Sequence, residues 1–146
     1  MQNSKLLLFY FVCFLFFFEI KSFSFENKIV AKIENKIITS IDIKNEYNYL
    51  LALNKELKNL NDKEFYELSK RSIIREKIKE IEISKYYDLD LPDEYIKSIL
   101  KNIYFKLNIN NFKDFENYLN QQQIDYSFVR NKIIIEALWN ELIINK

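Results

Sequence analysis

The chain lacks the residue types on which much enzyme chemistry depends. Its 146 residues include no histidine, no glycine, one cysteine and one proline. Without histidine, neither a Ser-His-Asp triad nor a Cys-His pair can form, and zinc sites built from histidine and clustered cysteine are excluded. Without glycine there is no P-loop and no dinucleotide-binding turn, because both need backbone without a Cβ atom near the phosphates. The composition leaves carboxylate chemistry, metal binding by carboxylates, or binding without catalysis, and it favours binding.

The length and composition are those of one globular domain. Apolar residues make up 49% of the chain and charged residues 29%, and the mean hydropathy is -0.24. A sequence of this size is about one domain long. We therefore expect one packed domain without internal repeats or a flexible linker.

The first 24 residues have the pattern of a secretory signal peptide. Thirteen apolar residues follow Lys5 and end at Glu19, and the triplet Ser22-Phe23-Ser24 supplies small residues for a cleavage site. A membrane-spanning helix needs about 20 apolar residues, so a retained anchor is the weaker alternative. We expect cleavage after Ser24 and export from the cytoplasm, with residues 25–146 as the mature domain.

Removal of this leader would leave a chain without thiols and without net charge. The only cysteine, Cys13, lies within the leader and is interpreted as an apolar filler, so no disulfide framework is expected. Residues 1–24 contain two of the 22 basic and one of the 21 acidic residues, so the remainder is neutral. Non-specific nucleic-acid binding depends on a basic face, so nucleic acid is not an expected partner. Membrane contact is expected only through an uncleaved leader.

A short β-hairpin is predicted at the start of the mature domain. Residues 29–38 contain two β-branched runs on either side of Glu34-Asn35-Lys36. This arrangement is typical of a hairpin turn, and we expect Asn35 to take the positive-φ position that a glycine would otherwise fill.

Two helices are predicted after the hairpin, each beginning with a capping-box-like sequence. The first begins at Thr39–Asp42 and is expected to run to about Lys58. The second begins at Asn61–Glu64, is the longest element, and is expected to end near Tyr87. The apolar stripe of this second helix contains Phe65, Leu68, Ile74, Ile78 and Ile81.

Three further helices are predicted after a short break at residues 88–91. Pro92 fits the first turn of the third helix, Phe112 marks a short fourth helix, and Asp125 caps the fifth, which runs nearly to the C-terminus. The second and third helices should be neighbours because the break between them is short. The buried side of the third helix is expected to contain Ile96, Ile99, Ile103 and Leu107. The sequence therefore predicts a mostly α domain: a short N-terminal β-hairpin followed by about five packed helices.

Carboxylate pairs are the catalytic candidates that remain. Asp88 with Asp90, and Glu80 with Glu82, are two residues apart, a spacing at which side chains do not face each other on a helix. Asp88 and Asp90 also lie where a helix ends, a common place for aspartate because its side chain bonds local backbone donors. The series Asp88-x-Asp90-x-x-Asp93 lacks the sharp glycine turn of a calcium loop. We expect no catalytic residue, no metal site and no cofactor.

Aromatic residues, 16% of the chain, are the feature best suited to binding. Phe65, Phe128 and Trp139 lie on apolar stripes and are expected in the core. Other aromatic residues form adjacent pairs or flank a stripe, so some of their rings are expected to face solvent, where a rigid ring offers contact area at low entropic cost. The candidate contact residues for a bound polypeptide are Tyr86, Tyr87, Tyr95, Tyr104, Phe105, Phe112 and Tyr118.

Three segments, taken in order, resemble one family of exported folding factors. The first, residues 30–43, contains the hairpin and the sequence Ile-Thr-x-x-Asp. The second, residues 73–96, runs from the long helix into the next helix, which begins with Pro-Asp-Glu. The third, residues 123–133, contains the start of the last helix. Together they are similar to the N-terminal chaperone domain of the SurA-like parvulin-type isomerases over almost the whole mature chain. The family often has glycine where this chain has Lys36, Asp88 and Gln123, a difference that affects turns and leaves the apolar stripes unchanged.

The resemblance implies binding of unfolded outer-membrane protein segments in the periplasm without ATP. Parvulin active sites rely on histidines, so it also implies no prolyl isomerase activity in this polypeptide. One alternative is that the chain is the N-terminal fragment of a SurA-like isomerase whose parvulin domain is missing here. Another is a secreted structural protein that oligomerises through its helices. The partners considered also include a second copy of the chain, in a homodimer.

Overall fold

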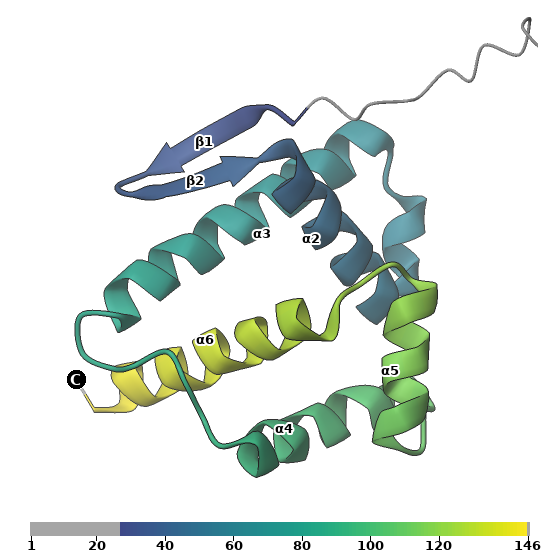
Figure 1. Cartoon of the computed structure of the whole chain (residues 1–146). Helices are drawn as coiled ribbons and strands as arrows, with labels where there is room; N and C mark the ends of the chain where they lie inside the picture. Colours follow the sequence, from purple (N-terminus) through teal and green to yellow (C-terminus); the bar gives the residue numbers. More distant parts are fainter. Residues whose placement is uncertain (1–26, 146) are drawn as a thin grey trace, which may run out of the picture.

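The structure, a computed structural model, describes residues 27–145, so the predicted leader and its cleavage site lie outside the described residues. This part of the chain forms a two-stranded antiparallel hairpin followed by five α-helices, arranged as in Figure 1. This confirms the predicted fold class. The elements in order are β1 (Ile29–Ile33), β2 (Lys36–Thr39), α2 (Ser40–Leu53), the 3-10 helix η1 (Lys55–Asn59), α3 (Asp62–Ile83), α4 (Asp93–Lys106), α5 (Phe112–Gln121) and α6 (Tyr126–Ile144).

The hairpin has a two-residue turn closed by the pair Ile33 and Lys36. The positive φ belongs to Glu34, at 50°, and not to Asn35 as predicted. A two-residue turn can reverse the chain with positive φ at its first central position, and in a chain without glycine Glu34 takes that conformation. The hairpin packs on the helices through Ile38, which is fully buried.

The starts of the helices agree with the predicted caps. Thr39 and Asp42 form a capping box at α2, with the Thr39 N–H donating to Asp42 Oδ2 at 2.7 Å. Asn61 and Glu64 form a second box at α3, and Asp125 caps α6 by accepting from the Ser127 N–H at 2.6 Å. Each side chain satisfies backbone donors that a helix start leaves unpaired.

The ends of the first two helices come earlier than predicted. α2 stops at Leu53 because Asn54 is extended and its Oδ1 accepts from the Glu56 N–H at 3.0 Å, which starts η1 in place of further α-helix. α3 stops at Ile83, where the Ser84 hydroxyl donates to the Ile81 carbonyl at 2.8 Å. Short polar side chains that bond nearby backbone compete with helix continuation in this way.

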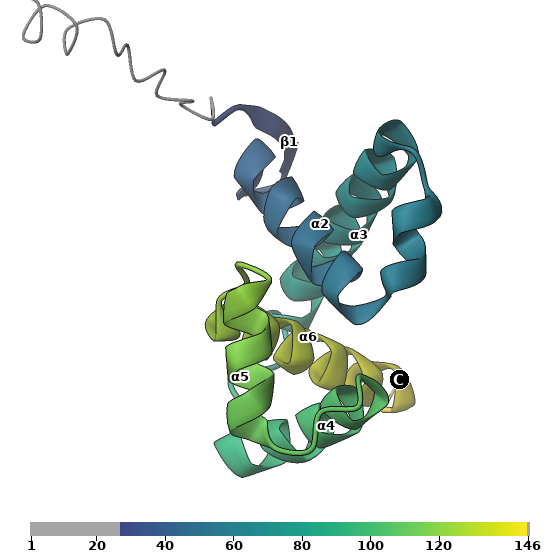
Figure 2. The same ribbon diagram turned by 90° about the vertical axis from the view of Figure 1, so that its right-hand side faces the viewer.

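α6 is the central helix of the described fold. It packs against α3 on one side and α4 on the other, and α5 packs on α4, as Figures 1 and 2 show. The prediction that the second and third helices are neighbours is wrong, because α6 lies between them. The segment after α3 passes the C-terminal end of α6 and brings α4 to its far side (Figure 1). Pro92 lies at the N-cap of α4, one position before the helix begins.

The core is divided into a large and a small cluster. The small cluster joins the hairpin to α2 and α3 through Ile38, Ile43 and Ile73. The large cluster fills the space between α4, α5 and α6 and the ends of α2 and α3. The fully buried side chains of the large cluster include Ile83, Ile96, Leu100, Phe115 and Leu119.

Ile78 was predicted on the apolar stripe of α3 but is 51% exposed. No helix in residues 27–145 combines the length and the apolar character needed to span a membrane.

Candidate functional site

An open groove of about 550 Å³ lies between the first turn of α4 and the C-terminal turns of α6. Most of the side chains that line it are apolar, and two asparagines and one glutamate lie among them. Binding sites for ligands commonly combine an apolar lining with a few polar groups of this kind. The lining residues are Leu91, Pro92, Tyr95, Ala137, Leu138, Asn140, Glu141, Ile144 and Asn145.

Arg130 fixes one wall of the groove. Its Nη2 lies 3.1 Å from Oδ1 of Asp90 and 3.1 Å from Oδ1 of Asp93, and it donates to the Leu91 carbonyl at 3.4 Å. The hydrogen bond from Arg130 is the main cause that lowers the pKa of Asp90. The guanidinium therefore ties the segment before α4 to α6, and Pro92 at the N-cap restricts the backbone there further.

Two apolar side chains on opposite sides of the groove remain in contact with water. Tyr95 of α4 is 51% exposed and Ile144 of α6 is 82% exposed. Ile143, next to Ile144, is also exposed, whereas Leu142 is buried in the core. Apolar side chains that gather around a groove in this way often mark a surface that binds another molecule.

Three of the seven aromatic candidates are exposed, but only Tyr95 lines the groove. Tyr86 follows the end of α3 and is 58% exposed. Phe105, near the end of α4, is 46% exposed, and the Lys101 ammonium lies 5.6 Å from the centre of its ring. A separation of ten residues along α4 places Phe105 about 15 Å from Tyr95.

The other four candidates support the core. Tyr104 is 7% exposed, and its ring centre lies 5.7 Å from that of Phe115, so it is a core residue and does not offer a surface for contact. Tyr87 and Phe112 are half-buried against the same core, and Phe112 makes an edge contact with Tyr126. Tyr118 is half-buried as well, and burial raises its pKa.

The Tyr118 hydroxyl joins α5 to the end of α2 by donating to the Ala52 carbonyl at 2.7 Å. Tyr118→Phe is expected to lower the free energy of unfolding by about 1 kcal/mol, because it removes a partly buried hydrogen bond without changing the ring. Urea unfolding followed by circular dichroism measures the loss. Tyr95→Phe, at an exposed ring, is the matched control, and an equal loss in both variants would contradict the structural role of Tyr118.

The glutamate pair considered from the sequence, Glu80 with Glu82, is held by basic side chains. Glu80 lies 2.7 Å from the Nζ atoms of both Lys36 and Lys77; burial alone would raise its pKa, but the two ammonium groups outweigh that effect and lower it. Glu82 pairs with Lys85. In residues 27–145 no group of three or more His, Cys, Asp or Glu side chains is placed to hold a metal ion.

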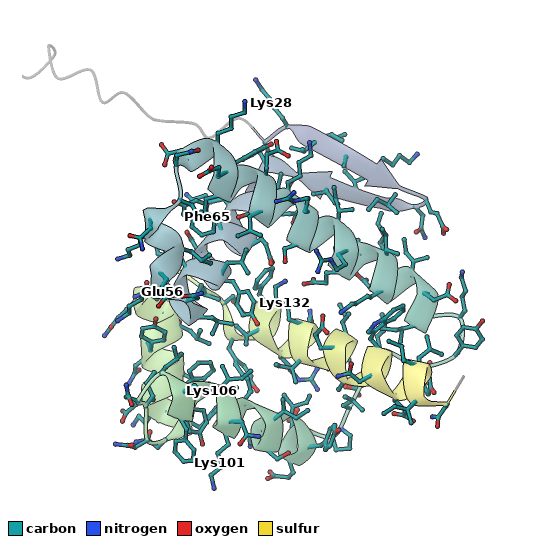
Figure 3. The ribbon with its side chains drawn as sticks, turned by 180° about the vertical axis from the view of Figure 1, so that it is seen from behind. Lys28, Glu56, Phe65, Lys101, Lys106 and Lys132 are labelled. Carbon is teal, nitrogen blue, oxygen red and sulfur yellow. The ribbon has the colours of Figure 1, made fainter. Side chains whose placement is uncertain are left out.

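A buried ionic cluster, which the sequence analysis did not predict, lies where α6 meets α2 and α3. Lys132 of α6 is 6% exposed and its Nζ lies 2.5 Å from Oε2 of Glu46 on α2. The same Nζ donates to Oε2 of Glu76 on α3. The ring centres of Tyr49 and Phe128 lie 4.9 and 5.0 Å from Nζ, and Figure 3 shows Lys132 in the interior between the helices.

One oxygen of this ionic cluster has no partner in the described part of the chain. Glu46 is 1% exposed, and its Oε1 accepts no hydrogen bond from residues 27–145. Burial raises the pKa of Glu76 and outweighs the opposing effect of Lys132. Burial also raises the pKa of the Tyr49 hydroxyl, and the nearby carboxylates raise it further. Two cavities of about 300 and 360 Å³ adjoin the cluster.

The sequence contains a weak signal for the cluster. Lys132 follows Phe128 by four residues and Val129 by three, so all three lie on one face of the helix, and Phe128 is on a predicted apolar stripe. Glu46 likewise follows the apolar residue Ile43 by three positions on its helix. A charged residue on an apolar stripe indicates a buried ion, but its partners, 86 and 56 positions away in the chain for Lys132, cannot be identified from periodicity.

Comparison of the chain with known protein families, curated proteins and solved structures gives no match. The roles of the groove and of the ionic cluster are therefore inferred from their own geometry and chemistry.

Proposed function

We propose that this chain is a periplasmic chaperone domain that binds extended apolar segments of unfolded polypeptides, outer-membrane proteins among them, without ATP. The observation that carries the proposal is the groove between α4 and α6, with Tyr95 and Ile144 exposed on its two sides. The leader pattern in the sequence and the resemblance to SurA-like chaperone domains point in the same direction.

An extended polypeptide fits the chemistry of this groove. Strands of outer-membrane proteins alternate apolar and polar residues, so every second side chain of an unfolded strand is able to face an apolar lining. Asn140 and Asn145 supply amide groups along one wall that can hydrogen-bond to a peptide backbone irrespective of its sequence. The groove is therefore suited to many apolar segments without reading a particular sequence.

Electrostatics adds little to binding at this site. Glu141 is the one charged side chain among the described residues that line the groove. A ligand held by apolar contacts loses little affinity when salt screens charges. We therefore expect the affinity for an apolar peptide to change by less than about twofold between 50 and 500 mM NaCl, as measured by fluorescence anisotropy.

The groove is tested by removing its exposed apolar side chains. Ile144→Asn and Tyr95→Ser are each expected to weaken binding of a labelled ten-residue peptide of alternating tyrosine and threonine by roughly tenfold, because each loses the burial of an apolar side chain worth about 1.4 kcal/mol. The protein produced by secretion from its full sequence is used, and fluorescence anisotropy measures the dissociation constant.

Phe105→Ser is the control, because Phe105 is nearly as exposed as Tyr95 but lies outside the groove. The unaltered protein is also expected to suppress aggregation of a urea-unfolded porin at a near-stoichiometric ratio, and the groove variants to do so less well. Absence of binding to peptide and porin by the folded protein would contradict the proposal.

A further inference from the structure

α6 is joined to α2 and α3 by a buried cluster in which charges of opposite sign do not balance. We propose that Lys132, Glu46 and Glu76 form an ionic latch that holds α6 on the α2–α3 pair and that tightens when Glu76 takes up a proton. The inference does not depend on what the groove binds, because it concerns the contact between helices.

The geometry gives the latch a central place in this contact. Lys132 projects from α6 and meets one carboxylate from each of the other two helices. All three residues line a cavity of about 300 Å³, and Glu76 also lines one of about 360 Å³, so close packing is interrupted around them. The contact between α6 and the α2–α3 pair therefore depends more on these ion pairs than it would if apolar side chains were closely packed around them.

The charges of the latch add to minus one when both carboxylates are ionised. One ammonium faces two carboxylates, and Oε1 of Glu46 has no hydrogen-bond partner within residues 27–145. An uncompensated charge away from water is costly. A proton on Glu76 makes the latch neutral and leaves the ion pair of Lys132 and Glu46 intact.

The charged groups around the latch do not add a second buried cation to it. Asp42 on α2 accepts from Thr39 at the helix cap, and Arg75 on α3 is exposed. On α3, Lys77 pairs with Glu80, which also binds Lys36 of β2, and Lys79 pairs with Glu136 of α6 at 2.6 Å. None of these pairs supplies a second buried cation to the latch, and the Tyr49 hydroxyl, whose pKa is raised, stays neutral in the same range.

The direction of the pH dependence follows from the raised pKa of Glu76. In the unfolded chain this carboxyl has its ordinary pKa of 4.5, so above that pH the folded protein holds a proton that the unfolded chain has released. The stabilisation is complete below the ordinary pKa and is lost as the pH rises through the higher pKa of the folded state. The latch is thus tightest below the ordinary pKa of the carboxyl and weaker at higher pH.

The experiment measures unfolding of the secreted protein by urea at half-unit steps from pH 4.5 to 8.5. In the unaltered protein the equilibrium constant for unfolding is expected to rise by up to about tenfold per pH unit in the window above 4.5. Glu76→Gln keeps the shape of the side chain and removes its titration, so its profile in that window is expected to be flat. Glu136→Gln alters an ion pair between the same two helices at an exposed position and is expected to retain the slope.

Hydrogen exchange, corrected for the intrinsic rate at each pH, locates the effect. Amides of α6 near Lys132 are expected to lose protection with rising pH in the unaltered protein and not in Glu76→Gln. Glu46→Gln provides a second test, because it removes a charge that raises the pKa of Glu76 and should reduce the slope. A slope that persists unchanged in Glu76→Gln, or one that disappears equally in Glu136→Gln, would overturn the proposal.

Discussion

Replacement of Lys132 by methionine is expected to destabilise the protein by about 3–5 kcal/mol, because it leaves the carboxylates of Glu46 and Glu76 buried without their cation. Methionine has a similar length, so the loss would reflect the missing charge more than a cavity. Glu46 is 1% exposed, so loss of the ammonium leaves its carboxylate with almost no contact with bulk solvent. Urea unfolding at pH 7, followed by circular dichroism, measures the change.

Neutralising all three groups together is the control for this variant. Lys132→Met combined with Glu46→Leu and Glu76→Leu removes the stranded charges, and such replacements of buried ions are often neutral or stabilising. We expect the triple variant to recover most of the lost free energy of unfolding. A loss below about 1 kcal/mol in Lys132→Met alone, the range of an exposed ion pair, would show that the cluster is not buried as described.

The second large effect is expected at Phe115, the aromatic centre of the core between α4, α5 and α6. Phe115 is fully buried and its ring contacts Tyr104. Phe115→Ala is expected to lower the free energy of unfolding by about 3–5 kcal/mol, because it leaves a cavity in close-packed surroundings. Because folded domains are stable by only about 5–15 kcal/mol, this variant would be close to unfolding, and its midpoint in urea measures the loss.

Phe105→Ala is the matched control for Phe115→Ala. Phe105 is 46% exposed and lies next to Tyr104 on α4. Its removal is expected to cost about 0.5 kcal/mol or less, as is usual for surface positions. Similar losses at the two phenylalanines would contradict the orientation of α4 and α5 in the core.

Local signals in the sequence were sufficient to predict where helices begin. Thr39 with Asp42 and Asn61 with Glu64 are side chains that cap their own helix, so the information lies within four residues. Helix ends were predicted less well, because the apolar period continues past Leu53 and Ile83 while Asn54 and Ser84 form local bonds that stop the helix. A weak local contact determines where the helix ends, and the period of the apolar residues does not reveal that contact.

The packing of helices was harder to predict than their existence. A short connection between the second and third helices suggested neighbours, but α6 lies between α3 and α4 and contacts both. The buried face of α4 also differs from the prediction: Leu100 and Tyr104 are buried with Ile96, whereas Ile99 and Ile103 are half-buried. The position of α6, the last helix in the sequence, determines which face of α4 is covered.

The groove and the ionic latch combine residues that are distant in sequence. Tyr95 was predicted as a contact residue. Ile144, which lies across the groove from it, comes from the end of α6, and the packing of α6 against α4 was not predicted. Lys132 meets Glu46 and Glu76 only because three helices converge. α6 carries both the lysine of the latch and one wall of the groove, so displacement of α6 would alter both.

Photo-crosslinking tests the central proposal, binding of unfolded polypeptide in the groove, most directly. Benzoylphenylalanine is introduced in place of Tyr95, Ile144 or Phe105 in the protein expressed from its full sequence, and a urea-unfolded porin is diluted into the sample before irradiation. We expect strong crosslinks from the positions of Tyr95 and Ile144 and weak ones from that of Phe105. Crosslinks of equal yield at all three positions, or none from the two groove positions while the protein is folded, would contradict the account.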